Sequence, residues 1–274
     1  MIMAILMTNA TSSTPITEPG YWLGHYTRAD TAFTHILPTK KLRMSPYHTM
    51  RDPAENKDLA PVTSFFVDPQ ANQEQAFFET LKMLKDKRDR MRLLSLTHDV
   101  TRYRGAGNAV FGCCWARPRM WEQYADAHKG VCLVFDSKAL KAALRRHSSK
   151  MLLRNVTYTP TGISGSEASL IMDPRIFADS SREQAVTDYI VRQRRDLFFL
   201  KSEDWRTEYE FRALLAECED EYALVDFGRS LRMVVLGEKF PEAQCDEARD
   251  VCKAAGVVLK RATWWHGKPI PTSV

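Results

Sequence analysis

Two acidic residues, two positions apart in the last third of the chain, carry the strongest chemical signal in the sequence. The segment KSEDWRTEYEFR contains Glu208, Glu210 and Arg212. If residues 207–216 form a strand, these side chains point to one face, because side chains alternate along a strand. Two neighbouring carboxylates repel unless a cation, a bound hydroxyl or a change in protonation relieves them. The pattern predicts either an ion-pair ladder with Arg212 or a carboxylate poised against a sugar hydroxyl or a cationic transition state.

A second candidate block consists of His25, Tyr26 and Thr27, at the end of a predicted strand and just before a helix. An imidazole at such a junction can face a ligand, and the backbone amides beside it can donate to phosphate or carboxamide groups. The alternative is that His25 only caps the strand or the helix.

A third block, RMSPYHTMRDPAEN, is a predicted loop rich in turn-forming residues. Its candidate side chains are those of Ser45, Tyr47, His48, Asp52 and Glu55. The last three are of types that bind metals, but their spacing matches no compact metal motif. A metal site is therefore an alternative interpretation of this loop, beside a plain turn at Asp52.

The fourth block, WARPRMWEQYADAHKG, places three ring side chains at helical spacing. Trp121, Tyr124 and His128 would share one face of a helix over residues 119–128. A network of Tyr124, Asp126 and His128 that holds this helix to a sheet is the simpler interpretation. A ligand-binding face is the other.

In this order the blocks resemble a widespread bacterial domain of unknown function. Its usual pattern reads H-Y-T, N-D-P-x-E, M-W-x-x-Y-A-x-x-H-x-G and K-x-x-x-W-x-x-E-x-E-x-R. The resemblance covers roughly residues 21–262, and Arg51 stands where that family usually has Asn. It implies no activity.

A looser resemblance, to ADP-ribosyltransferase-like domains, implies a reaction. Those domains begin with an H-x-T element, place an aromatic residue or a serine in a middle block, and carry a Glu, often as E-x-E, on a late strand. The resemblance implies that His25 holds the adenosine-side ribose of NAD. It also implies that Thr27 and the backbone at Tyr26 contact the nicotinamide amide, and that Tyr47 or Trp121 stacks on the nicotinamide ring.

By the same resemblance, Ser45 is the alternative residue of the middle block, and Tyr124 is a further NAD-binding residue. Glu210 would bond the nicotinamide ribose, with Glu208 assisting toward the acceptor. NAD is then the substrate. Breaking its nicotinamide–ribose bond develops an oxocarbenium-like cation, which a preorganised carboxylate stabilises.

The composition indicates a globular protein with a sizeable core. Of 274 residues, 44% are hydrophobic and 27% charged, and the net charge of +5 tolerates a phosphate-bearing ligand or nucleic acid without indicating either. The six cysteines form no C-x-x-C pair, and their spacing suits neither a zinc ribbon nor a disulfide scaffold. Four lie in apolar or amphipathic stretches, a usage typical of the reducing cytoplasm. Residues 1–19 are predicted as a flexible tail and 20–274 as one domain. No segment has the length and apolar character of a membrane span, so no membrane partner is expected.

Predicted strands and helices alternate irregularly, which favours an α+β fold with mixed, largely antiparallel sheets and flanking helices. An ADP-ribosyltransferase-like split sheet would follow from the second resemblance. The predicted strands are 21–27, 41–45, 92–98, 109–116, 130–136, 152–159, 207–216, 222–227, 231–236 and 257–263. The predicted helices are 28–37, 73–91, 119–128, 137–147, 183–200 and 241–255. Strands 92–98 and 109–116 are predicted to form a hairpin.

The favoured hypothesis is a cytoplasmic ADP-ribosyltransferase or NAD glycohydrolase that acts as a toxin or phage-defence effector. Its acceptor would be a protein, nucleic acid, small molecule or water, and a cognate inhibitor would fit such a role. Two alternatives stay open. One is a metal-dependent nuclease or phosphoesterase that uses His48, Asp52, Glu55 and Glu210, and the other is a non-catalytic binding or regulatory module.

Overall fold

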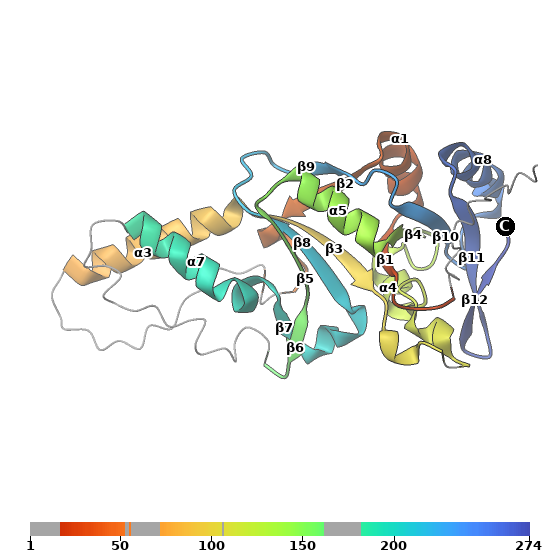
Figure 1. Ribbon diagram of the computed structural model, residues 1–274, viewed down its shortest axis with the longest axis horizontal. Helices are drawn as coiled ribbons and strands as arrows, with labels where there is room; N and C mark the ends of the chain where they lie inside the picture. Colours follow the sequence, from red (N-terminus) through yellow and green to blue (C-terminus); the bar gives the residue numbers. More distant parts are fainter. Residues whose placement is uncertain (1–16, 53–54, 56–71, 106, 162–181) are drawn as a thin grey trace, which may run out of the picture.

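A mixed, mostly antiparallel ten-stranded sheet forms the centre of the molecule, so the predicted α+β class is confirmed (Figure 1). The computed structural model describes residues 17–52, 55, 72–105, 107–161 and 182–274, with the backbone alone for 72–77. In sheet order the main path is β12 (Lys268–Thr272), β11 (Val258–Trp265), β10 (Leu231–Leu236), β4 (Val131–Asp136), β1 (Trp22–Thr27), β3 (Arg92–His98), β2 (Lys41–Pro46) and β9 (Ala223–Asp226).

The strand β3 is the branch point of this sheet. Along its whole length it pairs with β8 (Glu210–Leu215), which in turn pairs with β5 (Met151–Asn155). Its other edge is shared by β1, at Thr97 and His98, and by β2, at Arg92 and Leu93. In the register of the described strands, neither β1 nor β2 pairs with Leu94–Leu96. The sheet therefore has an opening between β1 and β2. The split sheet of ADP-ribosyltransferase-like domains, expected from the second resemblance, stays a prediction.

Because side chains alternate along each strand, the two faces of the sheet carry different apolar clusters. One face, with Leu94, Leu133 and Phe135, packs against helices α1 (Leu37–Thr39), α5 (Ser137–His147) and α8 (Cys245–Ala255). The other face carries two separate clusters. One cluster contains Trp115 and, from α4 (Pro118–Tyr124), Trp121. The other contains Tyr47 and Phe198, the last residue of α7 (Arg182–Phe198).

Helix α7 packs beside α3 (Asn72–Asp89), and the pair extends away from the sheet, at the left of Figure 1. After α7 the chain forms the short strand β7 (Leu200–Ser202), which pairs in parallel with β6 (Thr157–Thr159). The 3-10 segment η7 (Glu203–Glu208) then leads directly into β8. This path brings α7, η7 and β8 to the same end of the sheet.

Three of the predicted elements are wrong. The predicted strand 152–159 is two strands, β5 and β6, which belong to separate sheets. Residues 109–116 do not pair with β3, because Ala109–Gly112 form the 3-10 turn η4 and Cys113–Trp115 are core residues outside any strand. An apolar run alone does not separate a strand from a buried loop. The predicted helix 119–128 ends at Tyr124. The strand β12 was not predicted. It contains two prolines, which are accepted at the edge of a sheet, where β12 lies.

The start of the fold also differs from the prediction. The predicted helix 28–37 is instead largely a π-helix, η1 (Thr31–Ile36), in which the Asp30 carboxylate accepts from the Thr31 amide at 2.8 Å. Of the predicted tail 1–19, residues 1–16 lie outside the described residues. Glu18 accepts from the Gly105 amide at 2.8 Å, so the end of that segment contacts the fold. None of the helices that the structure describes is long and apolar enough to cross a bilayer.

Gly130, just before β4, allows a close backbone crossing and supplies a stability test. A side-chain Cβ at this position would collide with the carbonyl oxygen of Thr27 and with the backbone of Ala125. We predict that Gly130→Ala lowers the free energy of unfolding by about 2 kcal/mol or more, because overpacking against fixed backbone forces the chain to shift. Urea unfolding followed by circular dichroism measures this change. Gly107→Ala is the matched control, since a Cβ there meets nothing within 4 Å; equal effects of the two substitutions would contradict the prediction.

Candidate functional site

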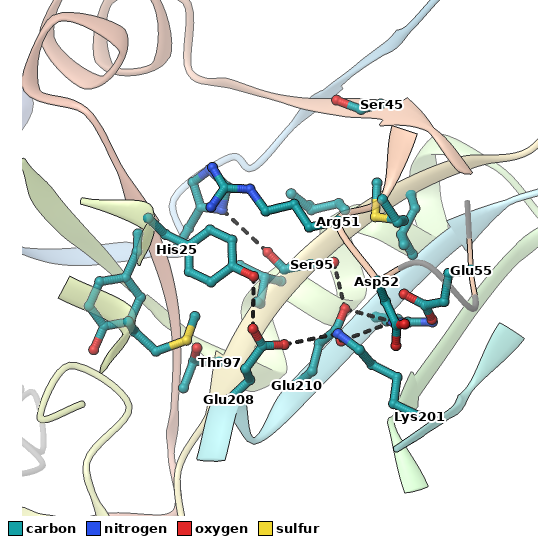
Figure 2. Close-up of a pocket in the computed structure, with 18 of the residues that line it drawn as sticks. His25, Ser45, Arg51, Asp52, Glu55, Ser95, Thr97, Lys201, Glu208 and Glu210 are labelled. Carbon is teal, nitrogen blue, oxygen red and sulfur yellow. Dashed lines mark hydrogen bonds and ion pairs between the residues drawn. The ribbon is translucent and has the colours of Figure 1, made fainter. Parts of the chain in front are cut away.

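A pocket of about 400 Å³ lies at the opening between β1 and β2. Its lining includes Ser95 and Thr97 from one face of β3 and Leu94 and Leu96 from the other, so the pocket enters the sheet. Its lining includes Tyr26 and Met120 of one apolar cluster and Leu93 of the other. Polar residues of the lining are labelled in Figure 2. Its volume is within the range of small-molecule sites.

Most of the residues singled out in the sequence line this pocket. The predicted residues on its wall are His25, Tyr26, Ser45, Asp52, Glu55, Tyr124, Glu208 and Glu210. They come from four separate blocks of the sequence. His25 and Glu210, from distant parts of the chain, thus line the same cavity. Ser45 lies apart from the carboxylates, on β2 (Figure 2).

Glu208 and Glu210 do not project from one strand as predicted. The strand β8 begins at Glu210, while Glu208 ends η7, and Tyr209 between them has a left-handed backbone with φ 47°. Their carboxylates nevertheless converge, because the ammonium of Lys201 lies 3.0 Å from Glu208 Oε2 and 3.2 Å from Glu210 Oε2. The cation that relieves their repulsion is thus a lysine of β7 together with the expected arginine.

Four hydrogen bonds fix the Glu210 carboxylate. Its Oε1 accepts from Ser95 Oγ at 2.6 Å and from Arg212 Nε at 2.8 Å, and its Oε2 accepts from Arg212 Nη2 at 3.0 Å and from Lys201 Nζ. Burial alone would raise the pKa of Glu210, but Arg212 and Lys201 outweigh it and lower the pKa to about 2. Glu210 is therefore a permanent, rigid negative charge in the wall of the pocket.

Arg212 links this carboxylate to a second one behind it. Its guanidinium is fully buried, lies 2.5 Å from Glu55 Oε1, and donates to the carbonyl of Phe198 at 2.6 Å. Burial raises the pKa of Glu55, although Arg212 opposes that rise. Glu55 also receives a hydrogen bond on its carbonyl from Arg88 of α3 at 2.9 Å. The loop after β2 is thus joined to both β8 and α3.

His25 reaches the pocket through the opening in the sheet. Its Nδ1 lies 3.4 Å from the carbonyl oxygen of Ser95, which can only accept, so the tautomer with a proton on Nδ1 fits this contact. Burial lowers the pKa of His25. The ring is therefore neutral near pH 7, and its Nε2 lone pair can accept a hydrogen bond from a ligand hydroxyl.

Tyr124 and Arg51 form another part of the pocket wall. The Tyr124 hydroxyl donates to Glu208 Oε1 at 2.7 Å, and the guanidinium of Arg51 lies 4.8 Å from the centre of the Tyr124 ring. Arg51 also donates to the carbonyl of Gln123 at 3.0 Å. Arg51, which stands where the family pattern has Asn, is thus an exposed cation over the pocket wall.

Three of the predicted roles are not supported by the positions of their residues. Trp121 is completely buried and donates to the carbonyl of Trp115 at 2.8 Å, so it cannot stack on a ligand. Tyr47 packs edge-on against Phe198 in the cluster at the end of α7. Thr27 is not among the residues that line the pocket. Trp121, the aromatic residue predicted from helical spacing, is a core residue, which is the commoner role of such residues.

The predicted network of Tyr124, Asp126 and His128 is also wrong. After Tyr124 the chain turns through three residues with positive φ, of 48°, 49° and 72° at Asp126, Ala127 and His128. Tyr124, before this left-handed turn, lines the pocket. His128, at its end, packs against Trp264, whose ring lies edge-on to the imidazole at 5.4 Å. The two side chains therefore serve different parts of the structure.

Ser95, Lys201 and Trp205 were missed as site residues. Lys201 and Trp205 belong to the K-x-x-x-W-x-x-E-x-E-x-R pattern, which gave a signal for both, but the prediction was confined to Glu208, Glu210 and Arg212. Ser95 had no signal in the sequence, because a serine in a strand is common and its contact with Glu210 depends on the β3–β8 register.

The residues of the metal-dependent alternative are not arranged as a ligand set. His48 lies outside the pocket wall, with its Nδ1 3.5 Å from Asp89 of α3. Lys201 and Arg212 occupy the space between Glu55, Glu208 and Glu210. Among the described residues, no group of three or more His, Cys, Asp or Glu side chains could hold a metal ion.

Fold and site together define an α+β protein with a polar pocket at an opening of its central sheet. Residues 120–213 match the model of a family described as a protein of unknown function, DUF2971. This segment contains Tyr124, Lys201, Glu208, Glu210 and Arg212, and it confirms the first resemblance for this part of the chain. No curated protein and no solved structure is significantly similar to the chain. The resemblance to ADP-ribosyltransferase-like domains therefore stays a prediction.

The lowered pKa of Glu210 predicts acid sensitivity. Because its pKa is about 2 in the folded protein and 4.5 without the fold, its ionised form stabilises the protein above pH 4.5, and this contribution disappears as the pH falls toward 2. The contribution is on the order of 3 kcal/mol. We predict that Glu210→Gln is less stable at pH 7 but loses less further stability between about pH 5 and pH 3 than the native chain.

Urea unfolding at several pH values measures this difference. Glu247→Gln, at an exposed position of α8, is the matched control and should follow the native pH dependence. A parallel pH dependence of Glu210→Gln and the native chain would show that Glu210 is not the titrating group.

Proposed function

We propose that this pocket cleaves the nicotinamide–ribose bond of NAD, as an NAD glycohydrolase or ADP-ribosyltransferase. The proposal is carried by the charge distribution of the pocket. The buried lining residues comprise four carboxylates, Asp52, Glu55, Glu208 and Glu210, and two cations, Lys201 and Arg212, which leaves an excess of two negative charges when all are ionised.

The rim of the pocket has the opposite sign. Arg43 and Arg51, both exposed, are the other charged residues of the described lining. A ligand with a cationic ring and a pair of phosphates complements such a site, because the ring can approach the carboxylates while the phosphates contact the arginines. NAD carries both groups.

The pocket also contains an unsatisfied polar group. The hydroxyl of Thr97, which is 1% exposed, has no hydrogen-bond partner among the residues that the structure describes. Buried hydroxyls are nearly always paired, and this one is on a wall of the pocket. A polar ligand that bonds Thr97 would remove this cost.

The reaction that fits the residues passes through a ribosyl cation. The bond between ribose C1′ and the pyridine nitrogen breaks with its electron pair going to nitrogen, so the cationic ring leaves as neutral nicotinamide. The ribose becomes an oxocarbenium-like cation. Water or another acceptor then forms the new bond at C1′ and loses its proton. Fixed carboxylates stabilise the cation because they need no rearrangement when the charge develops.

The two glutamates have different parts in this proposal. Each oxygen of Glu210 already accepts two hydrogen bonds, while each oxygen of Glu208 accepts one from the described residues, from Tyr124 and from Lys201. A carboxylate has about four acceptor sites in all. Glu208 is therefore the group that bonds the ribose hydroxyl and takes the proton of the acceptor, and Glu210 supplies fixed negative charge. The resemblance assigned the ribose contact to Glu210, so the proposal moves this contact to Glu208, which keeps its role toward the acceptor.

Glu208→Gln tests this assignment. We predict that it lowers the rate of nicotinamide release from NAD by about 100- to 1,000-fold, the usual effect of losing one preorganised group at a developing charge. Chromatographic measurement of nicotinamide gives the rate. The control is Glu203→Gln, an exposed position in the same segment η7, which should keep the native rate. A native rate in Glu208→Gln would contradict the role of this residue, and no release by the native chain under any condition would contradict the function.

The rim arginines give a second test. We predict that Arg51→Gln and Arg43→Gln raise KM for NAD about five-fold or more, since a charge-assisted contact to phosphate is lost. KM for nicotinamide riboside, which has no phosphate, should stay unchanged. Arg229→Gln, at an exposed position outside the pocket lining, is the control. Equal changes for both substrates would show that the arginines do not bind phosphate.

Loss of NAD is toxic to a cell, so the proposed activity would suit a toxin or a phage-defence effector, with a cognate inhibitor as its partner. Growth arrest on expression of the native chain, relieved by Glu208→Gln, would support this role.

A further inference from the structure

We propose that Lys201 and Trp205 are the positioning residues of this site, and that the Trp205 ring holds the Lys201 ammonium between Glu208 and Glu210. The proposal deepens the function proposed above, on which it rests for the reaction affected. Its geometric part concerns the charges alone and holds for any substrate.

Three groups surround the Lys201 ammonium. Glu208 Oε2 lies at 3.0 Å, Glu210 Oε2 at 3.2 Å, and the centre of the Trp205 ring at 4.6 Å from Nζ. A lysine ammonium has three N–H groups, so two carboxylates and one ring face account for all three directions. The side chain of Lys201 is 6% exposed, which leaves little room for water to replace the ring.

Trp205 is itself held in place by its own segment, η7, and by helix α4. It belongs to η7, where the hydroxyl of Ser202 caps the first turn. Arg119 of α4 lies over its ring at 5.8 Å and donates to the carbonyl of Asp204 at 3.1 Å. The orientation of the ring is thus set by two elements, and the ring is half-buried.

The ring contributes because it attracts the ammonium without neutralising it. The negative face of an aromatic ring binds a cation but carries no net charge, so the full positive charge of Lys201 acts on the two glutamates. A third carboxylate in the same place would add repulsion, and water would let the ammonium move. The arrangement keeps two like charges close together and both ionised.

Other charged groups also face the two glutamates and belong to the electrostatics of the site. Those around Glu210 and Lys201 are Arg212 on β8, Glu55 from the loop after β2, Tyr158 on β6 and Tyr124 on α4. The cations over the Trp205 ring among the described residues are Lys201 and, at 5.8 Å, Arg119 of α4. A change at Trp205 should therefore affect the glutamates through Lys201.

The test measures the titration of the Glu210 carboxyl, with ¹³C-labelled glutamate followed by NMR and Glu210→Gln used for assignment. We expect Trp205→Leu to raise its pKa by about one unit, because the ammonium is no longer held at close range. Trp205→Phe, which keeps an aromatic face, should restore most of the native value. Trp265→Leu, at a position 67% exposed on the β11–β12 hairpin, is the control and should leave the titration unchanged.

A purely structural role of Trp205 gives a different result. If Trp205→Leu lowers the melting temperature while Glu210 titrates as in the native chain, the proposal is wrong. If Trp205→Leu does not fold, fluorotryptophan in the native chain gives the same test, since fluorine weakens the negative ring face without changing the side-chain shape much. The Glu210 pKa should then rise in the native chain and stay constant in fluorotryptophan-labelled Trp205→Phe.

Nicotinamide release separates this proposal from the proposed function. We expect kcat in Trp205→Leu to fall at least about ten-fold, with partial recovery in Trp205→Phe. A native chain that releases no nicotinamide but shows the expected titration shifts would refute the function and support the positioning. Native activity that is unchanged in Trp205→Leu, with unchanged titration, would refute the positioning and leave the function standing.

Discussion

One buried guanidinium holds the site and the sheet together. Arg212 makes two parallel hydrogen bonds to Glu210, contacts Glu55 and donates to the carbonyl of Phe198 at the end of α7. Parts of the chain far apart in sequence thus meet at one charge. A buried charge that loses its partner costs several kcal/mol, so each of these groups depends on the others. The ionised state of the pocket residues therefore depends on the folding of this part of the sheet, and the fold depends on these ion pairs.

The position of the pocket explains how the chain accommodates so many buried charges. On this face of the sheet the apolar side chains form two clusters, one around α4 and one at the end of α7. The polar residues lie between them, where they pair with one another and face the cavity instead of interrupting a continuous core. Lys201 and Arg212 lie between the carboxylates and reduce their repulsion. The opening between β1 and β2 adds a neutral imidazole to this otherwise charged wall.

The fold class and much of the site could be predicted from the sequence, because they depend on local patterns. The E-x-E-x-R spacing identified the charged wall, and the irregular order of predicted strands and helices identified the α+β class. The predicted stacking of Trp121 failed because helical spacing does not reveal whether a face meets a cavity or a core. The contact of Ser95 with Glu210 depends on pairing between strands more than a hundred residues apart. Such register is set by the whole sheet, and no local signal contains it.

The opening in the sheet has a consequence for any molecule that enters it. In a strand, the N–H and the C=O of one residue point to the same side, so the backbone of Ser95, whose carbonyl faces His25, lies along the gap with β1 on one side and β2 on the other. A planar group with a donor and an acceptor, such as a carboxamide, can pair with the N–H and C=O of Ser95 as a residue of a neighbouring strand would. The occupant would then join β1 to β2 through β3. Binding would therefore stabilise the pairing of the central strands, including parts of the sheet that do not contact the ligand.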